Sequence, residues 1–372
     1  MSEAIGLVLT GGGGRSAYQV GALEAVAEVA AETGRPWPCE FLSGTSAGAI
    51  NVAFLAQRAD SFADAVRALG RLWDQLETKR VYRTDLRSLG RTGIRWLGER
   101  SFGALVPRGR GGGALLDTSP LRELLKRELD PDGIRKQLAG GRISGVAINA
   151  LDYCCGENQT FFQSLDSVAP WRRARRRGGR RQIGIEEVMA SASIPVLFPP
   201  VMIDGHPHGD GAVRNYAPLS APIKLGAEKL LVIGVRRKAP PQPAQGEEPS
   251  LGRIASVLLN STLLDGIDID LERLETINRL LAAGGATPEE HLQPIEAFVL
   301  RPEADLGLVA AEEAHHLPRL VRHLVRGLGE GKETADLISY LLFEGAYTRR
   351  LRHLGYADTL ARREELKRFL AG

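Results

Sequence analysis

The sequence predicts an α/β protein with three layers, in which helices cover both faces of a mainly parallel central sheet. Short, near-continuous apolar runs precede helical patterns with a glycine turn between them, and this order occurs twice before residue 60. Strands that are apolar along their whole length are typical of parallel sheets covered on both sides. The chain has 372 residues, 43% of them hydrophobic and 25% charged, which is the composition of a globular protein with a large core.

The first strand and helix are expected within residues 4–32. Residues 4–10 form a short apolar run, and four consecutive glycines separate this run from the helical pattern. In that pattern Glu24, Glu28 and Glu32 recur every four residues, with apolar residues filling the remaining positions. This spacing predicts a helix whose glutamates mark the solvent-exposed face.

The second unit has a strand near residues 40–43, a tight turn at 44–48 and a helix to about residue 58. Three stretches are expected to be loops or insertions because they are rich in glycine, arginine or proline: residues 100–113, 171–181 and 239–250. Further apolar runs predict strands near residues 143–150, 229–235 and 295–300.

One domain is expected rather than two independent ones. Residues 1–238 are predicted to form its core, and residues 239–250 a proline-rich loop. Residues 251–372 are predicted to be a mainly helical C-terminal elaboration of the same domain, which contributes the strand near residues 295–300.

Charge and cysteine content narrow the possible classes. The net charge of +3 gives no reason to expect a nucleic-acid partner. Cys39, Cys154 and Cys155 have no metal-ligand spacing and are expected to be reduced thiols of a cytoplasmic protein. The N-terminus lacks a basic region, so we expect no signal peptide. No apolar run reaches the roughly 18 residues of a spanning helix, so any membrane contact is expected to be peripheral.

The first chemical motif is the turn at residues 44–48, Gly-Thr-Ser-Ala-Gly. A serine between a strand and a helix adopts a strained conformation that exposes its hydroxyl, and small residues two positions away prevent collisions across the turn. Gly44 and Gly48 meet that need, and Ser46 is the candidate nucleophile. The helix that begins at Ala47 would stabilise developing negative charge. An ordinary glycine-rich turn is the alternative interpretation.

The second motif lies between the first strand and its helix and consists of Gly11, Gly12, Gly13, Gly14 and Arg15. Consecutive glycines let backbone N–H groups converge on an anion at a helix N-terminus. A nucleotide phosphate is one such anion, but the motif lacks the lysine of a P-loop, and serine occupies the third glycine position of a dinucleotide fingerprint. An oxyanion hole is the favoured use because a candidate nucleophile follows on the next strand.

The third motif is Asp210-Gly211-Ala212, which follows the segment Ala-Ser-Ala-Ser-Ile-Pro-Val-Leu-Phe-Pro-Pro at residues 190–200. Together and in this order, the three motifs resemble the patatin-like phospholipase family of bacteria. The resemblance spans residues 4 to about 235. Two positions depart from the family pattern: Ser16 stands where glycine is usual, and Ala212 where many members have a second glycine.

The resemblance implies a three-layer patatin-like fold and a serine acyl hydrolase of phospholipid, lysophospholipid or other lipid esters. It implies Ser46 as nucleophile, Asp210 as base, and an oxyanion hole formed by the Gly11 to Gly14 backbone with Arg15 nearby. A covalent acyl-enzyme would form, and no cofactor or metal is expected to take part. A dyad in which an aspartate acts directly also predicts an acid limb of kcat/KM below a typical histidine pKa.

Three other functions remain as alternatives. A triad-type α/β-hydrolase would be expected to carry its nucleophile later in the chain, after several strands. A non-catalytic lipid-associated scaffold would not need both Ser46 and Asp210. A nucleotide-binding protein would use the glycine loop for phosphate. His206 and His208 share a strand face with Asp210 if that segment is extended, but Asp204-Gly205 predicts a hairpin turn that leaves His206 exposed.

Two basic segments are candidate membrane contacts. Seven arginines lie within residues 172–181, where they could bind anionic headgroups or form a solvated loop. Residues 317–328 have helical apolar spacing with arginines on the opposite face. That pattern is typical of a helix packed on a core, and an interfacial helix is the alternative.

Overall fold

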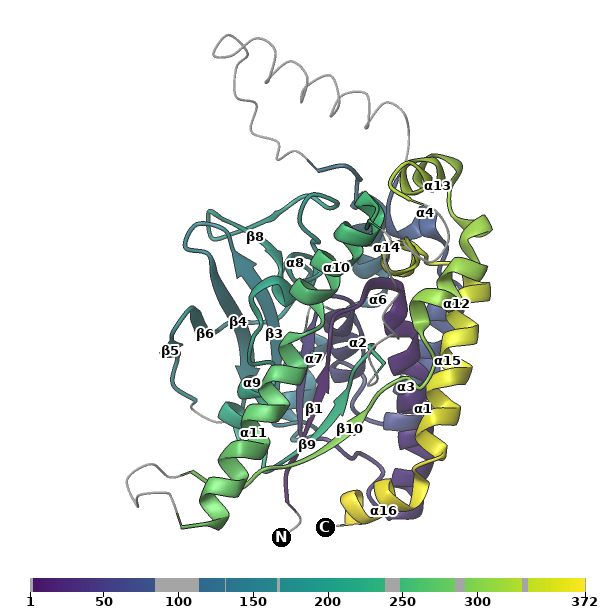
Figure 1. Cartoon of the computed structure of the whole chain (residues 1–372). Helices are drawn as coiled ribbons and strands as arrows, with labels where there is room; N and C mark the ends of the chain where they lie inside the picture. The colour runs from purple at the N-terminus through teal and green to yellow at the C-terminus, as the bar shows by residue number, and fades with distance from the viewer. Residues whose placement is uncertain are drawn as a thin grey trace.

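The computed structural model describes residues 3–83, 114–130, 132–165, 168–237, 248–284, 292–329 and 334–371. A twisted sheet runs through the middle of the molecule and helices lie on both of its faces, as Figure 1 shows. This is the three-layer α/β/α architecture that the sequence predicted. The predicted loop at residues 100–113 and most of the loop at residues 239–250 lie outside the described residues.

The centre of the sheet is parallel and contains every strand that the apolar runs predicted. In this part Leu7 pairs with Leu42 in register, so the first two predicted strands are neighbours. The strands, in spatial order, are β10 (Glu296–Leu300), β9 (Lys229–Ile233), β1 (Ile5–Leu9), β2 (Phe41–Thr45) and β3 (Gly145–Asp152).

Beyond β3 the sheet becomes mixed, which the sequence did not predict. β4 runs antiparallel to β3, β6 lies parallel to β4 and β5 antiparallel to β6, while β8 pairs with both β3 and β7. These marginal strands are β4 (Glu157–Ser164), β5 (Trp171–Arg173), β6 (Arg176–Arg180), β7 (Val201–Ile203) and β8 (His206–Asp210).

The prediction of a loop at residues 171–181 is wrong, because this segment forms the edge hairpin β5–β6. Trp171 stacks on Phe162 with ring centroids 4.8 Å apart. The arginines that suggested a solvated loop instead find carboxylates on neighbouring strands: Arg172 pairs with Glu157 at 3.1 Å, and Arg177 pairs with Asp152. Ring stacking and ion pairing together hold an arginine-rich strand that composition alone would not favour.

Each central strand is buried on both faces, as expected for a parallel sheet between two helical layers. In β1 the side chains of Leu7 and Leu9 pack into one core and that of Val8 into the other. The larger core lies under α1 (Ala17–Glu32), α2 (Ala47–Ala56), α3 (Phe62–Asp74) and α15 (Gly345–Leu360), and the smaller one under α9 (Ser220–Leu225) and α11 (Gly266–Ala282).

The glutamate row of α1 faces other helices as well as water, which corrects the solvent-face prediction. Glu24 pairs with Arg352 of α15, and Glu28 accepts a hydrogen bond of 2.6 Å from Tyr356 of the same helix. Glu32 lies 2.8 Å from Lys367 of α16 (Arg363–Ala371). The C-terminal helices therefore cover α1 through ion pairs that a local sequence pattern cannot reveal.

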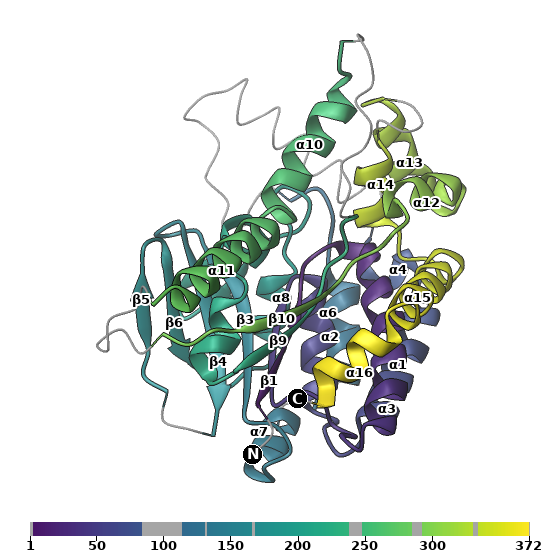
Figure 2. The same ribbon diagram turned by 60° about the horizontal axis from the view of Figure 1, so that its bottom comes forward.

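Helices of the C-terminal part gather beside the end of the sheet at which β1 and β2 finish (Figure 1, Figure 2). They include α10 (Leu251–Leu263), α13 (Arg319–Arg326) and α14 (Ala335–Leu341). In α13 the side chains of Val321 and Val325 are buried, and those of Arg319 and Arg326 are exposed. No helix among the described residues has the length and apolarity needed to cross a membrane.

Candidate active site

Ser46 lies at a sharp turn between β2 and α2. Its backbone has φ 56° and ψ −128°, a conformation that is strained for any residue except glycine. The turn is closed so tightly that a Cβ atom at Gly44 would lie 2.5 Å from the carbonyl oxygen of Gly48. A Cβ at Gly48 would collide with the carbonyls of Leu9 and Thr10. The structure therefore has the predicted tight turn between a strand and a helix, and the two glycines of this turn are required sterically.

A serine that sequence reasoning did not single out supports this strained turn. The Ser46 N–H donates a 2.9 Å hydrogen bond to Ser191 Oγ, and the Ser191 hydroxyl donates a 2.6 Å hydrogen bond to the Asn149 carbonyl. Two residues further on, the Ser193 carbonyl accepts a 2.8 Å hydrogen bond from the Asp210 N–H. The last residue of α8 (Ile185–Ser191) and the segment after it therefore hold the backbones of both candidate catalytic residues.

Asp210 ends β8 and is completely buried. Its Oδ1 accepts a 2.9 Å hydrogen bond from the Ala212 N–H, and its buried Oδ2 has no hydrogen-bond partner among the described residues. Burial raises the pKa of Asp210 to about 7, while the nearby Ser46 hydroxyl and the Ala212 N–H counteract part of that rise. A carboxyl group with a free oxygen beside a serine hydroxyl can accept a proton near neutral pH.

The glycine loop adjoins both residues. A Cβ atom on Gly11 would lie 3.0 Å from Ser46 Cβ and 3.4 Å from Ala212 Cβ, so the loop leaves little space beside Ser46. Gly13 has φ 55° and begins the short helix η1 (Gly13–Ser16) that leads into α1. The loop backbone thus lies where N–H groups at a helix N-terminus can approach an atom bonded to Ser46 Oγ.

Arg15, which was expected to join the oxyanion hole, uses its donors elsewhere. Its Nε donates to Ser339 Oγ at 2.6 Å, its Nη2 lies 2.5 Å from Asp336 Oδ1, and its guanidinium carbon lies 4.7 Å from the centroid of the Tyr340 ring. Its backbone N–H donates to the Gly12 carbonyl at 3.1 Å. Arg15 therefore connects the glycine loop to α14, a contact between residues more than 300 positions apart.

A chain of buried amides lies beneath the glycine loop. Gln19 Nε2 donates a 2.8 Å hydrogen bond to the Thr10 carbonyl, and Asn51 Nδ2 donates to Gln19 Oε1 at 3.1 Å. Trp73 Nε1 donates in turn to Asn51 Oδ1 at 2.8 Å. Since these side chains are buried and mutually bonded, they hold α1, α2 and α3 in a fixed relation to the loop.

A narrow apolar cavity begins at Ser46 and extends between α2, α3 and α6 (Ser119–Glu128). Ile50 lies on α2 one turn after Ser46, so it stands at the near end of the cavity wall. The lining residues are Gly13, Ser46, Ala47, Ile50, Leu72, Trp73, Leu76, Val81, Leu121, Leu124, Leu125, Ala192, Ile194, Phe198 and Phe343. A cavity with so few polar groups fits a hydrocarbon chain.

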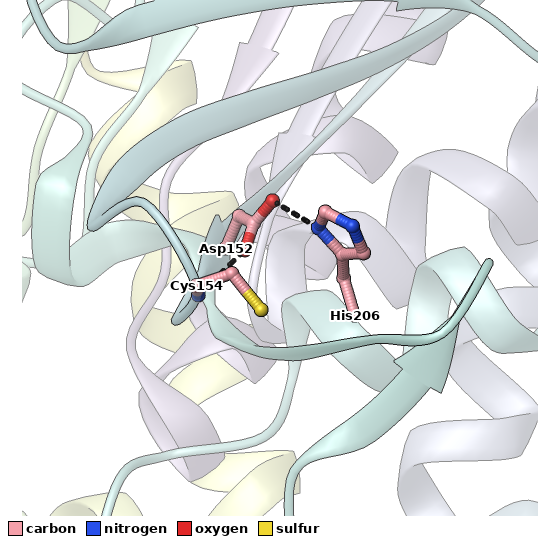
Figure 3. Close-up of side chains that lie close together, drawn as sticks. All are labelled: Asp152, Cys154 and His206. Carbon is pink, nitrogen blue, oxygen red and sulfur yellow. Dashed lines mark hydrogen bonds and ion pairs between the residues drawn. The ribbon is translucent and has the colours of Figure 1, made fainter.

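The two histidines of β8 interact with other groups. His208 Nδ1 lies 2.9 Å from the His206 carbonyl, and His206 Nδ1 lies 3.1 Å from Asp152 Oδ2 at the exposed end of the hairpin, as predicted for the Asp204-Gly205 turn. Figure 3 shows that Cys154 lies beside this pair. The three side chains could in principle approach one metal ion, but Arg177 already pairs with the Asp152 carboxylate and would repel a cation.

The sequence matches the family model described as patatin-like phospholipase over residues 7–223, and no curated protein matches it. Similar solved structures include human GIVD cytosolic phospholipase A2 in complex with methyl gamma-linolenyl fluorophosphonate, at 14% identity and a TM-score of 0.46, with 99% of this chain and 58% of that chain covered. VipD from Legionella pneumophila has 14% identity and a TM-score of 0.33, with coverage of 95% and 67%. The type III effector ExoU of Pseudomonas aeruginosa has 14% identity and a TM-score of 0.34, with coverage of 97% and 54%.

This chain thus spans between about half and two thirds of the lengths of those three chains. The family model covers more than half of the sequence, and the chain therefore belongs to the patatin-like phospholipase family of lipid-ester hydrolases.

Proposed function

We propose that the chain hydrolyses the acyl esters of phospholipids or lysophospholipids with Ser46 as nucleophile and Asp210 as its base. The observation that carries this proposal is a strained serine beside a fully buried carboxyl group whose pKa is about 7. When the pKa of a base lies near the working pH, a large fraction of the base is ionised. The ionised base is also strong enough to take a proton in the transition state.

The reaction would proceed through a covalent intermediate. Ionised Asp210 takes the proton of the Ser46 hydroxyl while Ser46 Oγ attacks the ester carbonyl, and backbone N–H groups of the glycine loop stabilise the oxyanion. The carbonyl–oxygen bond then breaks, and the departing alcohol receives the proton from Asp210. In the second half, water gives a proton to Asp210 and attacks the acyl group. The bond between the acyl group and Ser46 Oγ then breaks, which releases the fatty acid, and Asp210 returns the proton to Ser46 Oγ.

The cavity supports a fatty acyl chain as the part of the substrate that is recognised. It opens directly at Ser46 and its walls are leucine, isoleucine and aromatic side chains. A nucleotide is a poorer fit to the glycine loop, because the one cation in that loop, Arg15, is paired with Asp336. An unpaired cation or lysine is what phosphate groups of a nucleotide usually find in such a loop.

Labelling with a fluorophosphonate followed by peptide mapping tests the proposal. We expect one labelled peptide that contains Ser46, and Ser46→Ala should lose both the label and the hydrolysis of short nitrophenyl esters by several orders of magnitude. Ser61→Ala, at the half-buried N-cap of α3, is the matched control and should be as active as the parent. A folded Ser46→Ala protein that keeps substantial esterase activity, or label on another serine, would refute the assignment.

A further inference from the structure

The outer face of α10 is apolar and exposed to solvent. Leu251 is 68% exposed and Leu258 is 62% exposed, and Ile254 and Val257 on the same side of the helix are 43% and 49% exposed. These positions follow the three- and four-residue spacing of a single helix face. Large apolar side chains gathered in this way on a soluble surface usually mark a site of contact.

The inner face of the same helix is already packed. Gly252, Ser256 and Leu263 are buried, and Leu259 packs against the larger core. A helix with apolar residues on both sides is normally covered on both sides. Among the described residues only one side has such a cover, so the outer face of α10 is available to a partner.

Hydrogen bonds hold α10 in a fixed position relative to the glycine loop. Asn260 Nδ2 donates to Asp336 Oδ2 at 2.8 Å, and Tyr340 OH donates to Asn260 Oδ1 at 3.0 Å. Asp336 is the residue that pairs with Arg15 of the loop. α10 also packs against η2 (Gly211–Arg214), which follows directly after Asp210. A partner seated on α10 therefore lies beside the candidate active site.

The charged residues of α10 and α13 favour an anionic partner. α10 carries Arg253 and no acidic residue, and α13 carries Arg319, Arg322 and Arg326 and no acidic residue. Both helices lie at the same end of the molecule in Figure 1 and in Figure 2. Basic residues beside apolar ones match the surface of a membrane with anionic headgroups.

The arginine-rich hairpin β5–β6 is less suited to that partner. Three of the seven arginines in residues 171–181 pair with carboxylates of the protein. Arg181, directly after β6, pairs with Glu187 and with Asp204, each at 2.5 Å. Arg172 and Arg177 pair with carboxylates of neighbouring strands as described above. Charges neutralised in this way attract anionic lipid weakly.

We propose that the outer face of α10, with the arginines of α13 beside it, docks the protein on an anionic lipid surface. The proposal rests on the proposed function, because a lipid substrate must reach Ser46 from such a surface. Leucine, isoleucine and valine side chains of α10 would enter the region between headgroups and acyl chains, while the arginines contact phosphate groups. The position of α10 would then bring the active site to the surface that holds its substrate.

Vesicle flotation with the full chain tests this surface, with hydrolysis of a soluble nitrophenyl ester measured on the same samples. The vesicles contain phosphatidylcholine with or without phosphatidylglycerol. The variant is Leu258→Glu, and the matched control is Leu280→Glu, which places the same charge at a 58% exposed leucine of α11. Soluble-ester activity reports on the proposed function independently of vesicle binding.

We expect the parent and Leu280→Glu to float with phosphatidylglycerol vesicles and Leu258→Glu to bind at least about tenfold less tightly, since a leucine side chain leaves the apolar phase. All three should hydrolyse the soluble ester equally. Equal flotation of the two variants, or no flotation of an active parent, would overturn the proposal. So would a parent that sediments as a dimer and a Leu258→Glu variant that sediments as a monomer, because a second copy would then be the occupant.

Discussion

At the residue scale, Asp210 shows most clearly how burial changes the pKa of a side chain. A sequence with an aspartate base predicts an acid limb well below the pKa of histidine, especially with Arg15 nearby. The structure differs on both points: burial raises the pKa of Asp210 to about 7, and the Arg15 guanidinium is bonded to α14. The pH profile alone therefore cannot separate a dyad from a triad.

A pH profile and a stability curve of Asp210→Asn together test this environment. In the parent, kcat/KM for a soluble ester should fall as the pH drops below about 7, because the base becomes protonated. The same burial makes the ionised carboxylate costly. The folded protein binds more protons than the unfolded chain between about pH 4 and 7, so its stability falls as pH rises through that window.

Asp210→Asn removes the ionisable group and keeps the acceptor for the Ala212 N–H. We expect it to be inactive at every pH and, at pH 8, more stable than the parent to urea by a few kcal/mol, roughly. The difference should disappear near pH 4. An Asp210→Asn protein that is active, while His206→Ala or His208→Ala is inactive, would contradict the dyad.

The sequence indicated the roles of some residues of the candidate site and not those of others. Ser46 stands in a short motif whose meaning is local, and Asp210 was implied by the family resemblance, so both could be proposed as site residues without a structure. The role of Ser191 could not be named, because its hydroxyl acts on the backbone of Ser46, 145 positions away. The partners of Arg15 were hidden for the same reason.

At the scale of single elements, apolar runs located the five parallel strands because burial on both faces leaves a continuous signal. None of the strands beyond β3 has a long continuous apolar run in its sequence. In β6 the residues are arginine and glycine, and the strand is held by its pairing with β4 and by ion pairs across the sheet. Its residues have low β propensity, and tertiary contacts override that propensity.

The helix α2 carries both the nucleophile turn and part of the cavity wall, which makes acyl-chain preference testable. Ile50→Trp places a large ring in the cavity one turn after Ser46. We expect kcat/KM for a palmitoyl ester to fall by about tenfold or more relative to an acetyl ester, whose acyl group does not reach the ring. The ratio of the two rates is the measurement.

A structural defect would lower both rates together, and an unchanged ratio would mean that the acyl chain binds elsewhere. Leu115→Trp is a suitable control, because Leu115 is 36% exposed and is not part of the cavity wall. Its melting temperature and its rate ratio should match those of the parent.

At the scale of the whole molecule, the candidate active site adjoins a contact between residues that are far apart in the sequence. The Arg15 side chain is 4% exposed, and its ionic partner Asp336 belongs to the C-terminal helices. Removal of one member of a buried ion pair leaves the other charge without compensation.

We expect Asp336→Ala to lose about 3 kcal/mol of unfolding free energy in urea and to lower kcat for a soluble ester more than it changes KM. The glycine loop would still bind substrate but would hold the oxyanion less firmly. Asp268→Ala, which breaks the ion pair with Arg301 of the β10 end, is the control and should leave kcat unchanged. A normal kcat in a destabilised Asp336→Ala protein would show that the ion pair between Arg15 and Asp336 contributes to stability alone.

The ion pair between Arg15 and Asp336 also has a consequence for a chain that is still being synthesised. Ser46 and Asp210 leave the ribosome well before residue 336, and at translation speeds of roughly 5–20 residues per second the delay is on the order of ten seconds. During that interval the guanidinium of Arg15 has no α14 to bind. The glycine loop of the nascent polypeptide therefore lacks its contact with α14 until the chain has been synthesised past residue 341.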